Sequence, residues 1–334
     1  MPSGQPEPLT RHLVYQKVVG ETGIWIADVD GGHARLLVPG GAAPAISPDG
    51  KWVAYIAGCD QSGQCKSTDV VSTSDGKPQL ISSHASGVIA WSPDSERVVA
   101  LDPGKEDGVP DSTLLSIDVA SGKEVTLAHG DLYGASFSPD GKQIAFAVAK
   151  KPSDEGFIVE KIDLFVTGRD GGEAKQITDD GQSGWPVWGP KSIAFAKLIP
   201  SRGWGRDELW QTQPDGSERR PIIAPLPKRF LGFGYEGLVP IDWSEDGAAL
   251  LAGWGNEWGT IPIAVDPQTG NAQQLVEYQA SEPVSLSRDA QLVLAFVVDN
   301  EGSHPERNTV LVVPYAGGKT QVVAKGAAAA SWNR

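Results

Sequence analysis

A repeated turn constrains the fold of this sequence more than any other feature. Six segments share one pattern, a short strand, a turn rich in Pro, Asp and Gly, and a second strand of alternating apolar residues. They are AISPDGKWVAYIA at 45–57, AWSPDSERVVALD at 90–102, SFSPDGKQIAFAV at 136–148, VWGPKSIAFAK at 187–197, DWSEDGAALLAGW at 242–254 and SLSRDAQLVLAFV at 285–297. Pro presets φ in such a turn, the Asp side chain caps it, and Gly accepts a positive φ. The pattern therefore predicts many short antiparallel strands.

A second motif follows each copy of the first and predicts two strands joined by a tight, Gly-containing hairpin. LSIDVASGKEVTL and FVTGRDGGEAKQI are examples. One more copy, WIADVDGGHARLL at 25–37, lies before the earliest copy of the first motif, which begins at residue 45. The turns of the first motif begin at 47, 92, 138, 189, 244 and 287, with gaps of 43 to 55 residues. One further period ends at ASWNR, where Trp332 stands in the place of Trp91 and Trp243. Inner strands and outer hairpins therefore both number seven.

The two ends of the chain complete each other in this scheme. The last strand has no partners after it, whereas HLVYQKV at 12–18 and the hairpin at 25–37 lack an inner strand. Four-stranded sheets arranged radially protect their strand edges only when they form a closed ring. We therefore predict an all-β fold, a seven-bladed β-propeller of four-stranded antiparallel blades, closed by the C-terminal strand pairing with N-terminal strands. Residues 1–10 are expected to be a flexible linker, and 11–334 a single domain.

The turn sequence resembles the PD40 repeat, a WD40-like repeat of the TolB-like β-propeller family, over nearly the whole chain. SPDGK is intact at 47–51 and 138–142, and it drifts to GPK at 189–191, SED at 244–246 and SRD at 287–289. The paired Gly-His and Trp-Asp signals of WD40 repeats are absent. The resemblance implies either an envelope protein that binds other proteins, as TolB does, or a propeller preceding an α/β-hydrolase domain. No G-x-S-x-G nucleophile elbow is present, and we expect no hydrolase domain.

Charge and hydropathy exclude some classes of partner. The chain has 42 Asp and Glu against 28 Lys and Arg, a formal net charge of −14, which disfavours nucleic acid. No stretch reaches the roughly 18 apolar residues of a membrane span. The start, MPSGQPEPLTR, resembles the linker after a removed signal or lipid anchor, and a cytosolic protein with a flexible N-terminus is the alternative. We expect a periplasmic, extracellular or envelope-anchored protein.

The two cysteines bear on the same question. Cys59 and Cys65 lie in one polar loop, CDQSGQC, and their separation allows a disulfide. A disulfide would place the protein outside a reducing cytosol, and two incidental thiols are the alternative.

Catalytic and metal-binding signals are weak. The five histidines, His12, His33, His84, His129 and His304, show no metal-ligand spacing. An enzyme using His84 or His304 with a loop carboxylate is the minor alternative. Acid-rich turns at 28–32 and 168–172 resemble calcium loops but lack the bidentate Glu of an EF-hand, so turn chemistry explains them better. No cofactor is expected, and calcium is a minor alternative.

Loop length and tryptophan distribution indicate a binding face. In each blade the turns joining strands one to two and three to four lie on one face, whereas the long segments, such as 198–207, 225–238 and 253–259, lie on the other. The predicted binding residues combine aromatic rings with Arg in these loops. They are Trp185, Arg202, Trp204, Arg206, Phe230, Phe233, Tyr235, Trp254 and Trp258. A cluster that merely packs the loops is the equal alternative.

These features favour a non-catalytic scaffold that binds a protein or peptide through its long-loop face. The alternative is a stand-alone hydrolase or lyase, or a carbohydrate-binding propeller, with a site at the mouth of the central channel. In that alternative the binding partner is a small molecule or glycan, not a protein or peptide.

Overall fold

The chain is built from β-strands alone in the part that the structure describes. The computed structural model describes residues 11–58, 67–104, 112–150, 161–199, 206–223, 236–256, 259–276, 281–297 and 307–333. These ranges contain 28 strands and no α-helix. The search of the same ranges for a helix long and apolar enough to span a membrane therefore finds none.

Five of the sheets have four strands, and neighbouring strands in them are antiparallel. The first combines β28 (Ala327–Trp332) with β1 (His12–Lys17), β2 (Gly23–Asp28) and β3 (Arg35–Pro39). The other four are β4 (Ala42–Ile46), β5 (Trp52–Ala57), β6 (Ser67–Ser72) and β7 (Pro78–Ser82); β8 (Val88–Trp91), β9 (Arg97–Asp102), β10 (Thr113–Asp118) and β11 (Glu124–His129); β12 (Asp131–Phe137), β13 (Gln143–Lys150), β14 (Lys161–Gly168) and β15 (Lys175–Gln176); and β24 (Ser281–Leu286), β25 (Leu292–Val297), β26 (Thr309–Pro314) and β27 (Gln321–Lys325).

The remaining sheet has eight strands in two antiparallel groups of four. The first group is β16 (Ser183–Trp188), β17 (Ile193–Ile199), β18 (Arg206–Thr212) and β19 (Arg220–Ile223), and the second is β20 (Glu236–Trp243), β21 (Leu250–Asn256), β22 (Gly259–Val265) and β23 (Ala272–Gln274). A short parallel pairing of β18 with β20, at Arg206↔Glu236 and Asp207↔Gly237, joins the groups.

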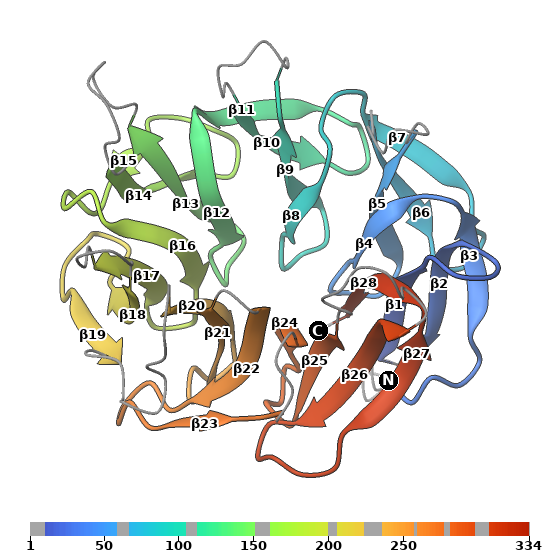
Figure 1. The fold of residues 1–334 in the computed structure, drawn as a ribbon. Coiled ribbons are helices and arrows are strands. Elements are labelled where there is room, and N and C mark those ends of the chain that lie inside the picture. Colours follow the sequence, from blue (N-terminus) through green and yellow to red (C-terminus); the bar gives the residue numbers. More distant parts are fainter. Residues whose placement is uncertain are drawn as a thin grey trace, which may run out of the picture.

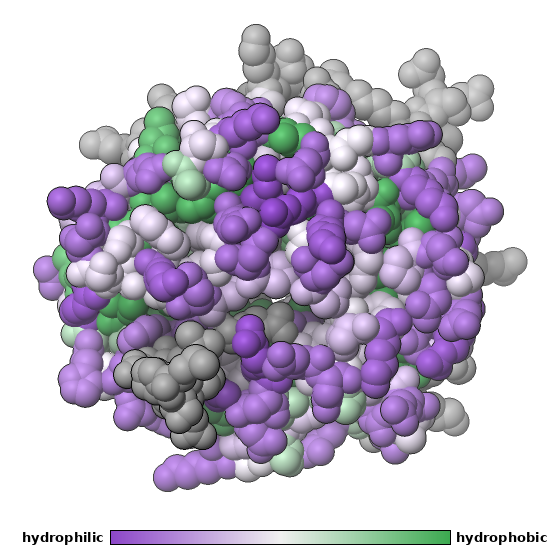
Figure 2. All heavy atoms as spheres, turned by 180° about the vertical axis from the view of Figure 1, so that it is seen from behind, coloured by the Kyte–Doolittle hydropathy of each residue, from purple (hydrophilic) through white to green (hydrophobic). Residues whose placement is uncertain are grey.

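The sheets stand radially around a common centre (Figure 1). One strand of each four-stranded group lies nearest this centre, and these innermost strands are β28, β4, β8, β12, β16, β20 and β24. The side of the molecule turned away in Figure 1 is covered mainly by hydrophilic residues, with small separate hydrophobic patches (Figure 2). The fold is that of an all-β propeller, as the sequence predicts.

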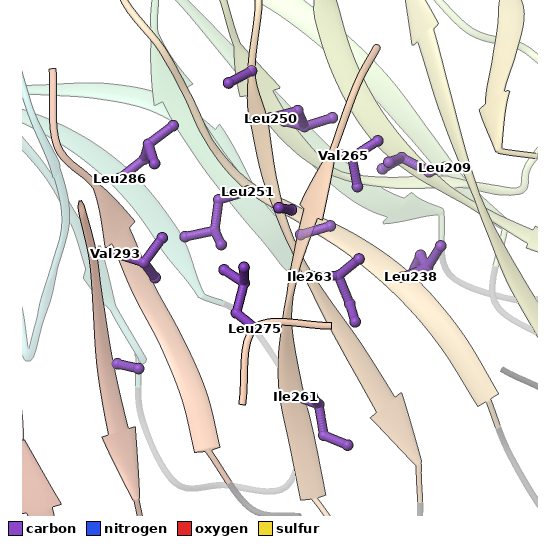
Figure 3. Packing of buried hydrophobic residues seen from close by; sticks show 14 of the residues in the cluster. Leu209, Leu238, Leu250, Leu251, Ile261, Ile263, Val265, Leu275, Leu286 and Val293 are labelled. Carbon is purple, nitrogen blue, oxygen red and sulfur yellow. The ribbon is translucent and has the colours of Figure 1, made fainter. Parts of the chain in front are cut away.

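The hydrophobic core lies between neighbouring sheets, because successive residues of a strand face opposite sides. In β5, Val53 and Tyr55 pack toward the sheet that contains β2, whereas Ala54 between them packs toward the sheet that contains β9. The largest cluster joins three groups of strands, with Leu209 from β18, Leu251 from β21 and Val293 from β25 (Figure 3). Every sheet therefore depends on both of its neighbours for burial.

A Ser-x-Asp turn joins an innermost strand to the next strand in five places. In the turn after β12, Ser138 Oγ donates to Asp140 Oδ1 at 2.7 Å and accepts from the Gln143 N–H at 2.9 Å. Asp140 Oδ1 also accepts from the Lys142 N–H at 3.1 Å. The same three contacts recur in the turns that begin at Ser47, Ser92, Ser244 and Ser287. The repeated sequence is thus a repeated hydrogen-bond unit.

One contact between the two ends of the described chain resembles part of this unit. β28 pairs antiparallel with β1, from Leu13↔Trp332 to Lys17↔Ala327. Asn333 stands where the other turns have Ser, and its Oδ1 accepts from the N–H of His12, the first residue of β1, at 2.6 Å. The pairing of the last strand with the first is therefore held by side-chain as well as backbone hydrogen bonds.

The recurring tryptophans of the innermost strands pack between sheets, as expected. Trp91 Nε1 donates to the Ala45 carbonyl at 2.9 Å, and Trp243 Nε1 donates to the Val187 carbonyl at 3.1 Å. Each bond joins two neighbouring innermost strands. Trp243 is 5% exposed and Trp332 is 3% exposed.

Candidate functional site

His84 lies between two carboxylates in the connection from β7 to β8. Its Nδ1 is 3.1 Å from Asp102 Oδ2, at the end of β9, and its Nε2 is 3.0 Å from Glu124 Oε2, at the start of β11. The imidazole remains accessible, since its side chain is 47% exposed. Both ring nitrogens can donate to these carboxylates only in the doubly protonated form.

The loop that carries His84 is fixed by buried polar groups. Ser82 Oγ accepts from the N–H of Ala85 at 3.1 Å, and Thr68 Oγ1 donates to the Ala85 carbonyl at 2.8 Å. Ser82, Thr68 and Ala85 are all buried. Asp102 is anchored as well, because its Oδ1 accepts from the Gly104 N–H at 2.9 Å. The histidine and one of its carboxylates are therefore positioned by the framework.

A histidine oriented by a carboxylate is an arrangement that general acid–base catalysis uses. The sequence suggests His84 with a loop carboxylate only as a minor alternative, since its two partners come from separate segments. His304, the other histidine of that alternative, lies outside the described residues.

The equivalent connection between β15 and β16 carries a different network. Asp180 Oδ2 is 3.1 Å from Lys197 Nζ and 3.2 Å from Arg219 Nη1. Burial would raise the pKa of Asp180, but hydrogen bonds from the Gln182 N–H, Ser183 and Lys197 outweigh burial and lower it. Lys197 also lies 4.4 Å from the centre of the Trp210 ring. Because two cations neutralise this carboxylate, the network serves to hold neighbouring sheets together.

Trp185 lies on innermost strand β16 and faces the neighbouring innermost strand β12. Its ring meets Tyr133 edge-on, with ring centroids 5.5 Å apart. Both residues sit where their strands shift register, at Leu132/Ala135 and Gly184/Val187, and Trp185 has a φ of +52°. β-Bulges re-aim side chains in this way. The two side chains present partly exposed aromatic surface near the common centre of the radial sheets, and such a surface suits a sugar ring or a cation.

The other predicted binding residues are not brought together with Trp185 in the described part of the chain. Trp254 lies within β21, pairs with Leu238 and Ile261, and packs against the largest core cluster. Arg206 begins β18 at the junction with β20. The rest lie outside the described residues, namely Arg202, Trp204, Phe230, Phe233, Tyr235, Trp258 and the disulfide candidates Cys59 and Cys65.

The acid-rich turns use their carboxylates within the protein. Asp28 Oδ2 is 2.6 Å from His33 Nδ1, and a hydrogen bond to Asp28, with its negative charge, raises the pKa of His33. Asp170 pairs with Arg97 at 2.6 Å. Turn chemistry and ion pairing account for both segments, and a search of the described residues for three or more potential metal ligands in one group finds none.

Comparisons with known proteins place this arrangement among β-propellers. No family model matches the chain. An oligogalacturonate lyase in complex with manganese is similar over 93% of this chain and 83% of its own, at 17% identity and a TM-score of 0.63. The β-propeller domain of the trilobed protease from Pyrococcus furiosus matches over 95% of both chains, at 14% identity and a TM-score of 0.65. A protein described as TolB from Agrobacterium tumefaciens matches over 80% of this chain and 89% of its own, at 16% identity and a TM-score of 0.52.

The expectation of a non-catalytic scaffold is wrong in the light of these neighbours. Besides the lyase, they include a puromycin-hydrolysing peptidase from Mycobacterium tuberculosis and a prolyl endopeptidase, which this chain matches over 55% and 49% of their lengths. The physical reason for the error is that a propeller supplies a rigid frame for either role, and a composition of Trp and Arg does not separate them. The neighbours favour the alternative of a hydrolase or lyase. In its architecture the chain has the TolB-like β-propeller fold.

Proposed function

We propose that this chain is an enzyme of the lyase or hydrolase class, with His84 as its general acid or base. The observation that carries the proposal is the pair of carboxylate oxygens 3.1 and 3.0 Å from the two nitrogens of one accessible imidazole. Asp102 is the orienting partner, because the Gly104 N–H anchors it. Glu124 is the partner that a substrate displaces, which frees Nε2 to exchange a proton with the reacting atom.

Saccharides are the substrate class that we propose first. Two similar structures, which this chain matches over 83% and 84% of their own lengths, are oligogalacturonate lyases, and they support a saccharide as substrate. The aromatic surface of Tyr133 and Trp185 adds a place for a sugar ring. The net charge of −14 favours neutral oligosaccharides over polyanionic ones.

The test uses one catalytic variant and one matched control. His84→Asn is assayed with neutral and uronate oligosaccharides, by reducing ends for hydrolysis and by ultraviolet absorbance of the unsaturated product for elimination. Loss of an acid–base group lowers kcat by about 10²–10⁴-fold. His129→Asn is the control, since His129 ends the outer strand β11 and its ring hydrogen-bonds the Thr113 hydroxyl, at 3.1 Å, with no carboxylate partner among the described residues. Equal activity of the two variants would refute the role of His84.

We also propose that the radial sheets are a closed ring of seven four-stranded blades. Two features support this proposal, the pairing of β28 with β1 and the division of the eight-stranded sheet into two antiparallel groups. The parallel bridge between β18 and β20 spans only two residue pairs, so it links two four-stranded groups whose other pairings are antiparallel.

A further inference from the structure

A pocket of about 170 Å³ opens between the β16–β19 group and the β20–β23 group. It is lined by residues of the turn after β16, the end of β18, the hairpin before β19 and the two equivalent turns of the next group. In an antiparallel group of four strands, the turn between strands one and two and the turn between strands three and four lie at the same end of the strands. The pocket therefore lies on the tight-turn face, opposite the predicted long-loop face and away from the connection that carries His84.

One turn that lines the pocket departs from the repeat. The turn at 189–192 has Gly189 where the other five have Ser, and it contains no Asp. A Cβ on Gly189 would lie 2.6 Å from the ring of Trp243. Gly247, on the next turn, would likewise place a Cβ 2.9 Å from Pro190. The indole of Trp243 thus takes the space of a Ser-x-Asp turn and forms part of the pocket wall.

Buried polar side chains orient an arginine in this pocket. The Gln211 amide satisfies both of its polar atoms when its oxygen faces Arg220. In that orientation Nε2 donates to Ser192 Oγ at 2.8 Å, and Oε1 accepts from Arg220 Nη1 at 3.1 Å and Nη2 at 2.8 Å. Ser192 and Gln211 are each only 7% exposed. Arg220 makes no ion pair with a carboxylate of the described residues. Its guanidinium is consequently held in place by Gln211 and remains exposed to solvent and to a ligand.

Two cations, Arg220 and Lys191, line the pocket. Lys191 also acts electrostatically on Asp246, and Asp266 accepts from the Gln268 N–H beside the pocket, so Arg220 is the cation most open to a ligand. The one carboxylate among the lining residues, Glu218, already accepts from Gln213 Nε2 at 3.2 Å. We propose that this pocket binds a small organic carboxylate, with the carboxylate on the planar guanidinium of Arg220 and the apolar part against Trp243. Arg forms two parallel hydrogen bonds to a carboxylate, which a point charge such as Lys does not. This site is independent of the proposed acid–base role of His84.

The experiment is a calorimetric titration of the full chain with benzoate and with benzamide, its neutral counterpart. We expect benzoate to bind at least about tenfold more tightly than benzamide, because only the anion pairs with Arg220. Arg220→Gln should lose this preference. Arg219→Gln is the matched control, since the neighbouring Arg219 is directed to Asp180 and the Ile177 carbonyl on another sheet. It should bind benzoate as the unmodified chain does.

Two outcomes would overturn the proposal. One is benzoate binding no tighter than benzamide in the unmodified chain, a comparison that needs no variant to fold. The other is unchanged benzoate binding by an Arg220→Gln variant with an unaltered circular-dichroism melt.

Discussion

In each repeated turn the Ser hydroxyl donates a hydrogen bond to the Asp carboxylate, and such hydrogen bonds lower the pKa of the Asp. In the last of these turns, hydrogen bonds from Ser287, from Arg11 and from the Gln291 N–H lower the pKa of Asp289 to about 2. Arg11 Nη2 lies 2.7 Å from Asp289 Oδ2 and brings the start of the described chain to this turn. Because the folded pKa lies below the ordinary value, the turn stabilises the protein above that value and loses this effect as the pH falls toward 2.

Removing the largest of these contacts should raise the pKa of Asp289 measurably. In Ser287→Ala the pKa of Asp289 should move up toward its ordinary value of 3.8, because the carboxylate loses a hydrogen bond to its charged form. Carboxyl chemical shifts followed by NMR from pH 5 to pH 1.5 measure it. Arg11→Gln removes a smaller contribution and should produce a smaller rise. A pKa unchanged by Ser287→Ala would show that the serine is not the main cause.

Contacts between residues close in sequence could be predicted, whereas contacts between separate segments could not. Ser287 and Asp289 are two positions apart, so their contact follows from local turn chemistry and is visible in the sequence. Asp102 and Glu124 reach His84 from β9 and β11, and nothing in the spacing of the three residues indicates that they meet. The contacts of Trp185 likewise depend on a bulge and on a neighbouring sheet.

Among the elements, the turn at 189–192 shows that a departure from a repeat can have a structural cause. The sequence presents Gly189 as drift from the consensus serine, yet the ring of Trp243, from the next innermost strand, fills the place of any side chain there. The elements themselves could be predicted, because their turns and alternation are local. The contact between Gly189 and Trp243 could not be predicted, because these residues are 54 positions apart in sequence.

Restoring the consensus at this element should therefore destabilise the protein. Gly189→Ser forces the Trp243 ring to move, at a cost of about 1–3 kcal/mol in the free energy of unfolding. Gly255→Ala is the control, since a Cβ there meets nothing within 4 Å, and its effect should stay within about 0.5 kcal/mol. Urea unfolding followed by tryptophan fluorescence provides both values. A serine variant as stable as the unmodified chain would contradict the assigned role of Trp243.

At the scale of the whole molecule, one sheet combines β28 with the N-terminal strands β1, β2 and β3. Gln16 on β1 and Ala329 on β28 are direct partners in this sheet. A disulfide between Gln16→Cys and Ala329→Cys should stabilise the fold by about 3–5 kcal/mol, because it closes a very long loop in the unfolded chain. The melting temperature of the double variant under oxidising and reducing conditions measures the gain. The parent chain, which keeps Cys59 and Cys65, is the control, and equal melting of both proteins when oxidised would contradict the pairing.

The Asn333–His12 contact has a consequence for the order of events during synthesis. These residues are 321 positions apart, so the sheet of β28 with β1, β2 and β3 lacks its inner strand until the ribosome has synthesised β28. Contacts between such distant segments form late and slowly. The edge of β1 that β28 will cover is meanwhile an unpaired strand edge, which invites association with other chains. Assembly of this protein is thus most exposed to aggregation at its first strand, in the interval before its last strand arrives.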